Sequence, residues 1–415
     1  MKRISLIACV LLIWARPAVA DVVVDWNVIV AQTLVTGAAT RPGPSGLFDY
    51  AMVHAAIHDA IQAFERRFEP YCSAIPNASG SPVAAAATAA YEVLADQFPA
   101  QAGALLITYG AYLTSHGLVG NAGVTVGHQA AACILNLRSG DGRFPSNPEA
   151  FFGGTAPGEW RPTGLSTVPM VAPWIGTVVP FTLKDPTQFR ASPPPPHLTS
   201  GLYARDYNEV KALGALVNSD RTPEQTDIGY FFADNAVAYW NRALRPLADA
   251  HLSDIGDSAR LFALVNIAMA DAVITAWDSK RFWHFWRPIT AIHEGNADGN
   301  PRTEGDATWQ PLITTPNYPD YTSGANNLSG ATTTMLANFF GTDDVTFSIT
   351  STTPQAIQKT RTYDRFSDAA ADIVDARIYE GIHFRFADTV ARRQGMHVAN
   401  WAFSHFLRPI GGNED

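Results

Sequence analysis

Residues 280–288 read Lys-Arg-Phe-Trp-His-Phe-Trp-Arg-Pro, so Lys280 and Arg287 enclose a dense aromatic run and Pro288 follows at once. The stretch ends a long segment, 254–279, that is apolar on almost every side. A helix without a polar face is typical of a protein centre. Aromatic neighbours exclude water and so strengthen the contact of a cation with a bound anion. We therefore expect a central helix whose carboxyl end carries an anion-binding site.

Two later segments add groups that bind anions. Ser323 and Gly324 precede a helical pattern at 324–340, where the glycine lets a ligand approach the backbone and free N–H groups attract negative charge. Arg377 and His383 lie in a third segment. Fixed cations, a hydroxyl, a backbone N–H and an imidazole can together surround a tetrahedral oxyanion such as phosphate or vanadate. The predicted anion-binding residues are Lys280, Arg287, Ser323, Gly324 and Arg377, beside His383.

Each segment alone also has a simpler explanation. Basic residues at a helix end satisfy carbonyl dipoles, and a serine before a helix is a common N-cap. A histidine among apolar neighbours is more often a hydrogen-bonded core residue than a ligand. The order and spacing of the three segments together favour a site.

The three segments resemble the signature of the superfamily of vanadium-dependent haloperoxidases and type-2 phosphatidic acid phosphatases. That signature is K-x6-R-P, then P-S-G-H, then S-R-x5-H-x3-D. The first block is complete in Lys280-x6-Arg287-Pro288. The similarity continues through the surrounding RPITAI, PNYPDY and GIHFRF stretches and covers most of the chain.

The second and third blocks depart from the signature at one position each. Residues 322–325 read Thr-Ser-Gly-Ala, so Ala325 stands where the family has an acid–base histidine. Ala387 takes the place of the last aspartate of the third block, and Asp388 follows one residue later, about 100° around a helix. The first departure concerns proton transfer, and the second concerns the group that orients the histidine.

The resemblance also implies a role for each matched residue. The equatorial oxygens of the anion would be held by Lys280, Arg287, Arg377, the Ser323 hydroxyl and the Gly324 N–H. The axial group would be His383, as the vanadium ligand of a haloperoxidase or as the nucleophile that forms a phosphohistidine in a phosphatase. Lys280 and His383 are the expected catalytic residues, and vanadate, or phosphate in the second case, is the expected bound anion.

Ala325 decides between the two chemistries. A phosphatase suffers more from the missing histidine, because an alkoxide leaving group needs a proton. Vanadate is itself a Lewis acid, so activation of peroxide suffers less. We therefore expect a vanadate-dependent haloperoxidase that oxidises a halide with hydrogen peroxide; the alternatives are a phosphatase of the type-2 class and a non-catalytic oxyanion binder. Candidate substitutes for the missing histidine are His284, His293, Asn326 and Asn327.

The N-terminus is typical of a signal peptide at residues 1–20. A basic start and a short apolar core precede Ala18-Val-Ala20, a small-residue cleavage site. We expect a secreted or periplasmic protein without a stable membrane span, since the apolar run is too short to cross a bilayer. Cleavage would remove three of the 29 Lys and Arg residues and leave 26 against 38 acidic ones, a net charge of about −12. This charge, without any basic run, argues against a nucleic-acid partner.

The remaining chain is long enough to bury a large core, and its long segments have helical periodicity, so the expected fold class is all-α. Helical patterns span 46–66, 82–97, 100–116, 122–138, 203–217, 223–236, 254–279, 324–340, 362–383 and 389–407, with a loop at 288–320. Between 141 and 202 the chain is rich in Pro and Gly and should be extended. We divide it into an N-terminal helical lobe at 21–200, which includes this connection, and a C-terminal helical site domain at 201–415, although a loop that crosses one continuous bundle explains the same composition.

Two further expectations concern cysteines and partners. Cys72 and Cys133 would share an oxidising compartment, where either a disulfide or two buried thiols are compatible with the sequence. No CxxC pair is present to suggest zinc or thiol redox chemistry. The expected partners are a small-molecule or anionic substrate, hydrogen peroxide and a halide, with a homodimer as an option.

Overall fold

The computed structural model describes residues 21–163 and 168–411 and is built almost entirely from helices. The predicted signal peptide lies outside the described residues. The first helices are α1 (Val22–Thr36), α2 (Gly46–Glu65), α3 (Pro82–Gln97), α4 (Ala102–Ser115) and α5 (Gly123–Leu137). The next are α6 (Gly201–Leu213), α7 (Pro223–Phe232), α8 (Ala236–His251), α9 (Ile255–Trp283) and α10 (Pro288–His293). The last are α11 (Gly324–Phe340), α12 (Phe366–Tyr379) and α13 (Arg385–His405), and β1 (Phe347–Thr350) pairs antiparallel with β2 (Thr360–Tyr363). The all-α prediction is confirmed, because this hairpin is the only sheet in the described chain.

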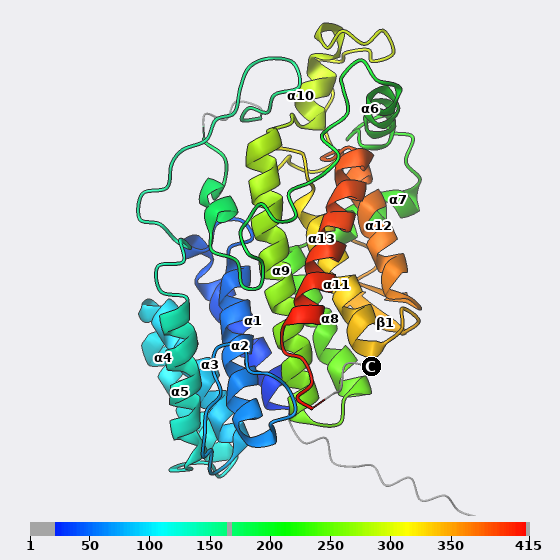
Figure 1. Ribbon diagram of the computed structural model, residues 1–415. Coiled ribbons are helices and arrows are strands. Elements are labelled where there is room, and N and C mark those ends of the chain that lie inside the picture. The colour runs from blue at the N-terminus through cyan, green and yellow to red at the C-terminus, as the bar shows by residue number, and fades with distance from the viewer. Residues whose placement is uncertain (1–20, 164–167, 412–415) are drawn as a thin grey trace, which may run out of the picture.

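Helix α9 runs through the middle of the bundle, with α1 to α5 on one side and α11 to α13 on the other (Figure 1). Nearly all of its side chains between Gly256 and Lys280 are buried, as the apolar pattern predicted. Within the described residues α9 is the one helix that is long and apolar enough to cross a membrane, and its apolar window is entirely buried within the protein. Its carboxyl end is therefore a rigid base for the side chains that follow.

The extended segment after α5 is held against α9. The Asp271 carboxylate of α9 accepts hydrogen bonds from the Phe181 and Thr182 N–H groups at 2.6 and 2.7 Å. Apart from short turns such as Pro173–Thr177, the described part of 141–200 is not helical, as predicted. One hydrophobic cluster includes side chains from both sides of residue 200, and the division into two domains there stays a prediction.

Several predicted boundaries are wrong, for local reasons. The predicted helix at 223–236 ends at Phe232. The Asn235 side chain accepts a hydrogen bond from Val237 N–H and so starts a new helix, α8. The sequence pattern did not predict α8. The predicted loop at 288–320 contains α10, which begins at a proline. The predicted helix at 362–383 starts with strand β2 and stops at Tyr379, before Gly381 with φ 78°.

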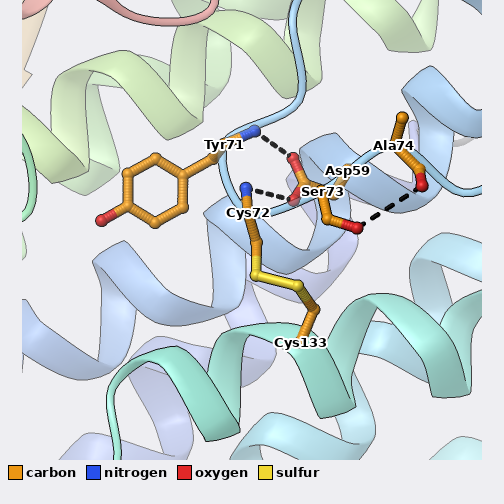
Figure 2. The surroundings of a disulfide bond; sticks show 6 residues. All are labelled: Asp59, Tyr71, Cys72, Ser73, Ala74 and Cys133. Carbon is orange, nitrogen blue, oxygen red and sulfur yellow. Dashed lines mark hydrogen bonds between the residues drawn. A yellow bond between two sulfur atoms is a disulfide. The ribbon is translucent and has the colours of Figure 1, made fainter.

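The disulfide between Cys72 and Cys133 joins the loop after α2 to α5, with the Cα atoms 6.2 Å apart (Figure 2). The buried Asp59 carboxylate positions the cysteine loop by accepting from the Tyr71 and Cys72 N–H groups at 2.6 and 2.8 Å. Of the two alternatives that the sequence left open, the structure has the bridge.

Candidate active site

The predicted site residues come from five places that meet at the carboxyl end of α9. Lys280 lies in the last turn of α9, and Arg287 is the N-cap of α10. Ser323 is the N-cap of α11, Arg377 lies in the last turn of α12, and His383 lies between α12 and α13. All five side chains are buried. The chain thus gathers positive charge where it is shielded from water.

The His383 ring has a fixed tautomer. Its Nε2 lies 3.0 Å from Arg287 NH1, and its Nδ1 lies 2.6 Å from Asp320 Oδ1. Because a guanidinium can only donate, Nε2 must accept and Nδ1 must carry the proton that is donated to Asp320. Burial and the cations Arg287, Lys280 and Arg377 hold the pKa of His383 well below its usual value. The imidazole is therefore neutral, with the Nε2 lone pair turned toward the cations.

Asp320 is the residue that sequence reasoning missed. Its carboxyl is fully buried, and burial raises its pKa to about 7, although Arg287 and Lys280 oppose the shift. The PNYPDY stretch was noted, but nothing in its spacing pointed to His383, 63 residues away. The carboxylate behind His383 is thus Asp320, whereas Asp388 accepts from Asn326 Nδ2 at 2.8 Å and does not bond the histidine.

Lys280 has donor capacity to spare. Its Nζ donates to the Pro319 and Asp320 carbonyl oxygens at 2.6 and 3.2 Å. An ammonium has three N–H donors, so one remains for another acceptor. Burial, and then Arg287, lower the pKa of Lys280 well below its usual value. A nearby anion would favour the charged form again.

Arg287 also lacks an acceptor. Its Nε and NH1 donate to the Tyr318 and Ile382 carbonyl oxygens at 2.7 and 2.6 Å. Its NH2 is buried without a hydrogen-bond partner in the described chain. An unpaired buried donor on a charged group is costly, so this nitrogen is suited to an acceptor from outside the chain.

Arg377 has a similar arrangement. Its NH2 donates to the Phe232 carbonyl and lies 2.8 Å from Glu380 Oε1, while its Nε is buried without a partner among the described residues. Burial raises the pKa of Glu380 to about 8, against the effect of Arg377. At neutral pH Glu380 is largely protonated, so the positive charge of Arg377 is not fully neutralised.

The start of α11 adds backbone donors. The Ser323 side chain makes no capping hydrogen bond, and the first N–H groups of a helix have no intrahelical partner. A Cβ on Gly324 would lie 3.2 Å from Trp277, so the glycine leaves room at a tight position. Gly324, Ala325 and Arg377 line one cavity of about 360 Å³. Of the site cations, Arg377 lines this cavity and can therefore be reached by a small molecule.

None of the candidate substitutes for the missing histidine lines this cavity in the described structure. His284 faces Glu159 at 3.7 Å, and His293 Nε2 lies 2.8 Å from the Trp309 carbonyl oxygen. The side chains of Asn326 and Asn327 are engaged in the core, on Asp388 and Gln394 respectively. Replacement of the acid–base group by one of these four is therefore not supported.

Comparisons with known proteins show which sequences and folds this chain resembles. Residues 260–412 match the sequence family described as VCPO second helical-bundle domain. The vanadium chloroperoxidase of Curvularia inaequalis is 29% identical over 201 residues, which cover 41% of this chain and 32% of that protein. The match thus spans about a third of that relative.

Solved structures extend the likeness to nearly the whole fold. The crystal structure of a bacterial vanadium-dependent iodoperoxidase has a TM-score of 0.79 at 22% identity and covers 95% of this chain and 97% of that chain. The holo form of a bacterial vanadium-dependent chloroperoxidase has a TM-score of 0.70 at 18% identity, over 86% of this chain and 90% of that one. Residues 260–412 are thus similar to the VCPO second helical-bundle domain, and the chain has the helical fold of the vanadium haloperoxidases.

Proposed function

We propose that the protein oxidises a halide with hydrogen peroxide at a vanadate held by this site. One observation carries the proposal: buried donors of Arg287 and Arg377 have no partner in the described chain and surround a neutral His383. Donors of this kind favour an oxyanion, and the Nε2 lone pair favours an electrophilic centre.

The residues fit vanadate. The spare Lys280 N–H, Arg287 NH2 and Arg377 Nε would hold its oxygens, together with the Ser323 hydroxyl and the Gly324 N–H. His383 would bind vanadate through Nε2. When bound, vanadate supplies the Lewis acidity that activates peroxide.

The protein's own groups have three tasks. The buried cations would stabilise negative charge on bound oxygen atoms. Asp320 holds His383 in the tautomer whose Nε2 carries no proton. The cavity at Ala325 admits peroxide and halide. In balance, halide, hydrogen peroxide and one proton give hypohalous acid and water.

A phosphatase is the second candidate, because a neutral His383 with an unprotonated Nε2 is also suited to attack on phosphorus. Ala325 disfavours it, since the leaving alcohol would need a proton at that wall of the cavity. Hydrolysis of a nitrophenyl phosphate ester, inhibited by vanadate, would support this candidate. Anion binding without either activity would instead support a non-catalytic binder.

We also infer a secreted or periplasmic location. The Cys72–Cys133 disulfide supports an oxidising compartment. Cleavage after Ala20 would leave Asp21, which caps α1 by accepting from Val23 N–H at 2.8 Å. Intact-mass measurement of the exported protein checks the cleavage site, and a homodimer stays a prediction.

The test of the proposed function is bromination of an acceptor dye with orthovanadate, bromide and hydrogen peroxide. We expect vanadate-dependent turnover in the wild type and none in His383→Ala. His397→Ala is the matched control, because His397 is an exposed histidine on α13. Absence of bromide and iodide oxidation at every pH from acid to neutral would overturn the proposal.

A further inference from the structure

A second cavity adjoins the first. It has a volume of about 270 Å³ and shares the lining residues Gly43, Asn235 and Val237 with the cavity at the cations. Its walls come from α1, from the segment before α2, from the start of α2 and from α8. The volume lies near the lower end of small-molecule sites, about 300 Å³, and so suits a compound with a single ring.

The lining of this second cavity is mostly apolar. Leu34 and Val35 of α1 face Val237 and Ala238 of α8 across it. Val35 is 79% exposed, so an apolar surface at the rim remains in contact with water. Covering such a surface with an apolar ring is favourable, at about 25 cal/mol per Å².

Three arginines give the cavity its charge, and two of them have acidic partners. Arg41 is paired with Asp49, with Nε 2.5 Å from Oδ2. Arg242 is paired with Asp234. Neither cation is therefore free to attract a further anion strongly.

Arg245 is different, because its hydrogen-bond partners are the uncharged side chains of Asn27 and Tyr50, although the cation Arg242 lies near it. Its Nε and NH2 donate to the Asn27 side-chain and main-chain oxygens at 2.7 and 3.3 Å. No carboxylate of the described residues forms an ion pair with it, and no Asp or Glu lines this cavity. A half-buried guanidinium beside an apolar pocket matches a carboxylate attached to an apolar body.

We propose that this second cavity binds a phenolic carboxylate, with its carboxylate on Arg245 and its ring between α1 and α8, as the organic acceptor of the halogen. The inference rests on the proposed function, because hypohalous acid would be released at the neighbouring site. An electron-rich ring in the second cavity would lie beside that place of release. The ring carbon forms a bond to halogen and loses its proton, which leaves with the hydroxide of hypohalous acid as water. The halogen donor is thus the product of the neighbouring site.

The test measures binding of 4-hydroxybenzoate by calorimetry, without vanadate, halide or peroxide and with saturating inorganic phosphate. Phosphate occupies the cations around His383, so that binding at the second cavity is measured alone. We expect the wild type to bind 4-hydroxybenzoate at least about tenfold more tightly than neutral 4-hydroxybenzyl alcohol, since the bond to a charged group is lost in the alcohol. Arg245→Gln should remove this difference.

Two further variants keep the test decisive. Ala238→Trp fills the cavity, retains Arg245 and should weaken binding of the acid by a similar factor, so it decides the matter if Arg245→Gln does not fold. Arg365→Gln is the matched control, because Arg365 is 56% exposed and pairs with the exposed Asp344. Equal affinity for acid and alcohol, or full binding in Ala238→Trp, would overturn the inference. Because the assay lacks vanadate and peroxide, its result is independent of halide oxidation: dye bromination without binding of the acid would refute this inference alone.

Discussion

Replacement of Asp320 by asparagine tests how His383 is held. The carboxylate accepts the Nδ1 proton of His383 at 2.6 Å and is completely buried. Asparagine keeps the volume but offers a neutral acceptor, and its amide can rotate and present a donor instead. The imidazole proton would then no longer prefer Nδ1. In a fraction of the molecules it would lie on Nε2, which could not then act as a ligand.

The size of the effect follows from this hydrogen bond. A bond to a charged group contributes about 1.5–3 kcal/mol, and a neutral one about 0.5–1.5 kcal/mol. The difference, roughly 1–2 kcal/mol, corresponds to about five- to thirtyfold in turnover. Removing negative charge beside Lys280, Arg287 and Arg377 should not weaken anion binding, and Coulomb attraction would even strengthen it.

The assay compares vanadate-dependent bromide oxidation with phosphate affinity by calorimetry. We expect Asp320→Asn to lose turnover while its phosphate affinity stays the same or rises. Asp344→Asn is the matched control, because Asp344 is 66% exposed. Unchanged turnover, or a parallel loss of turnover and phosphate affinity, would refute the assigned role of Asp320.

Three other changes have defined outcomes. Ala325→His should raise turnover by about tenfold or more, because it restores an acid–base group at the cavity, and should leave vanadate affinity nearly unchanged; a variant no faster than wild type contradicts this. Glu380→Gln removes a carboxyl whose pKa is 4.5 in the unfolded chain and about 8 in the folded protein. In the wild type this carboxyl therefore stabilises the fold below pH 4.5, and the stabilisation is lost as the pH rises through 8. The free energy of unfolding of the wild type, measured with urea, should therefore fall by a few kcal/mol relative to that of the variant between pH 4.5 and 8. The same pH dependence in both proteins would contradict this prediction. Cys133→Ser opens a loop of 61 residues and should cost about 4 kcal/mol in urea unfolding, whereas a wild-type midpoint insensitive to reductant would contradict the stabilising role of the bridge to Cys72.

The sequence was most informative where chemistry and periodicity coincide. The central position of α9 followed from its apolar pattern, and the basic residues at its end followed from the spacing of Lys280 and Arg287. Helix α7 begins at Pro223, where the helical pattern at 223–236 placed it, and Thr222 caps it in a capping box with Gln225. Such features are local, so neighbouring residues alone determine them.

What could not be predicted depends on distant contacts. Asp320 meets His383 across 63 residues of chain, and neither residue carries a signal for the other. Asp388, one position after the place expected for the histidine's partner, turns to Asn326 instead. Helix α8 contains Pro246 and was missed, because a proline inside a helix weakens the pattern although packing retains the helix.

A crystal structure with orthovanadate tests the central claim most directly. We expect vanadium bonded to His383 Nε2, with its oxygens within hydrogen-bond distance of Lys280, Arg287 and Arg377 and of the start of α11. Vanadate bound elsewhere, or bound among the cations without a bond to His383, would contradict it.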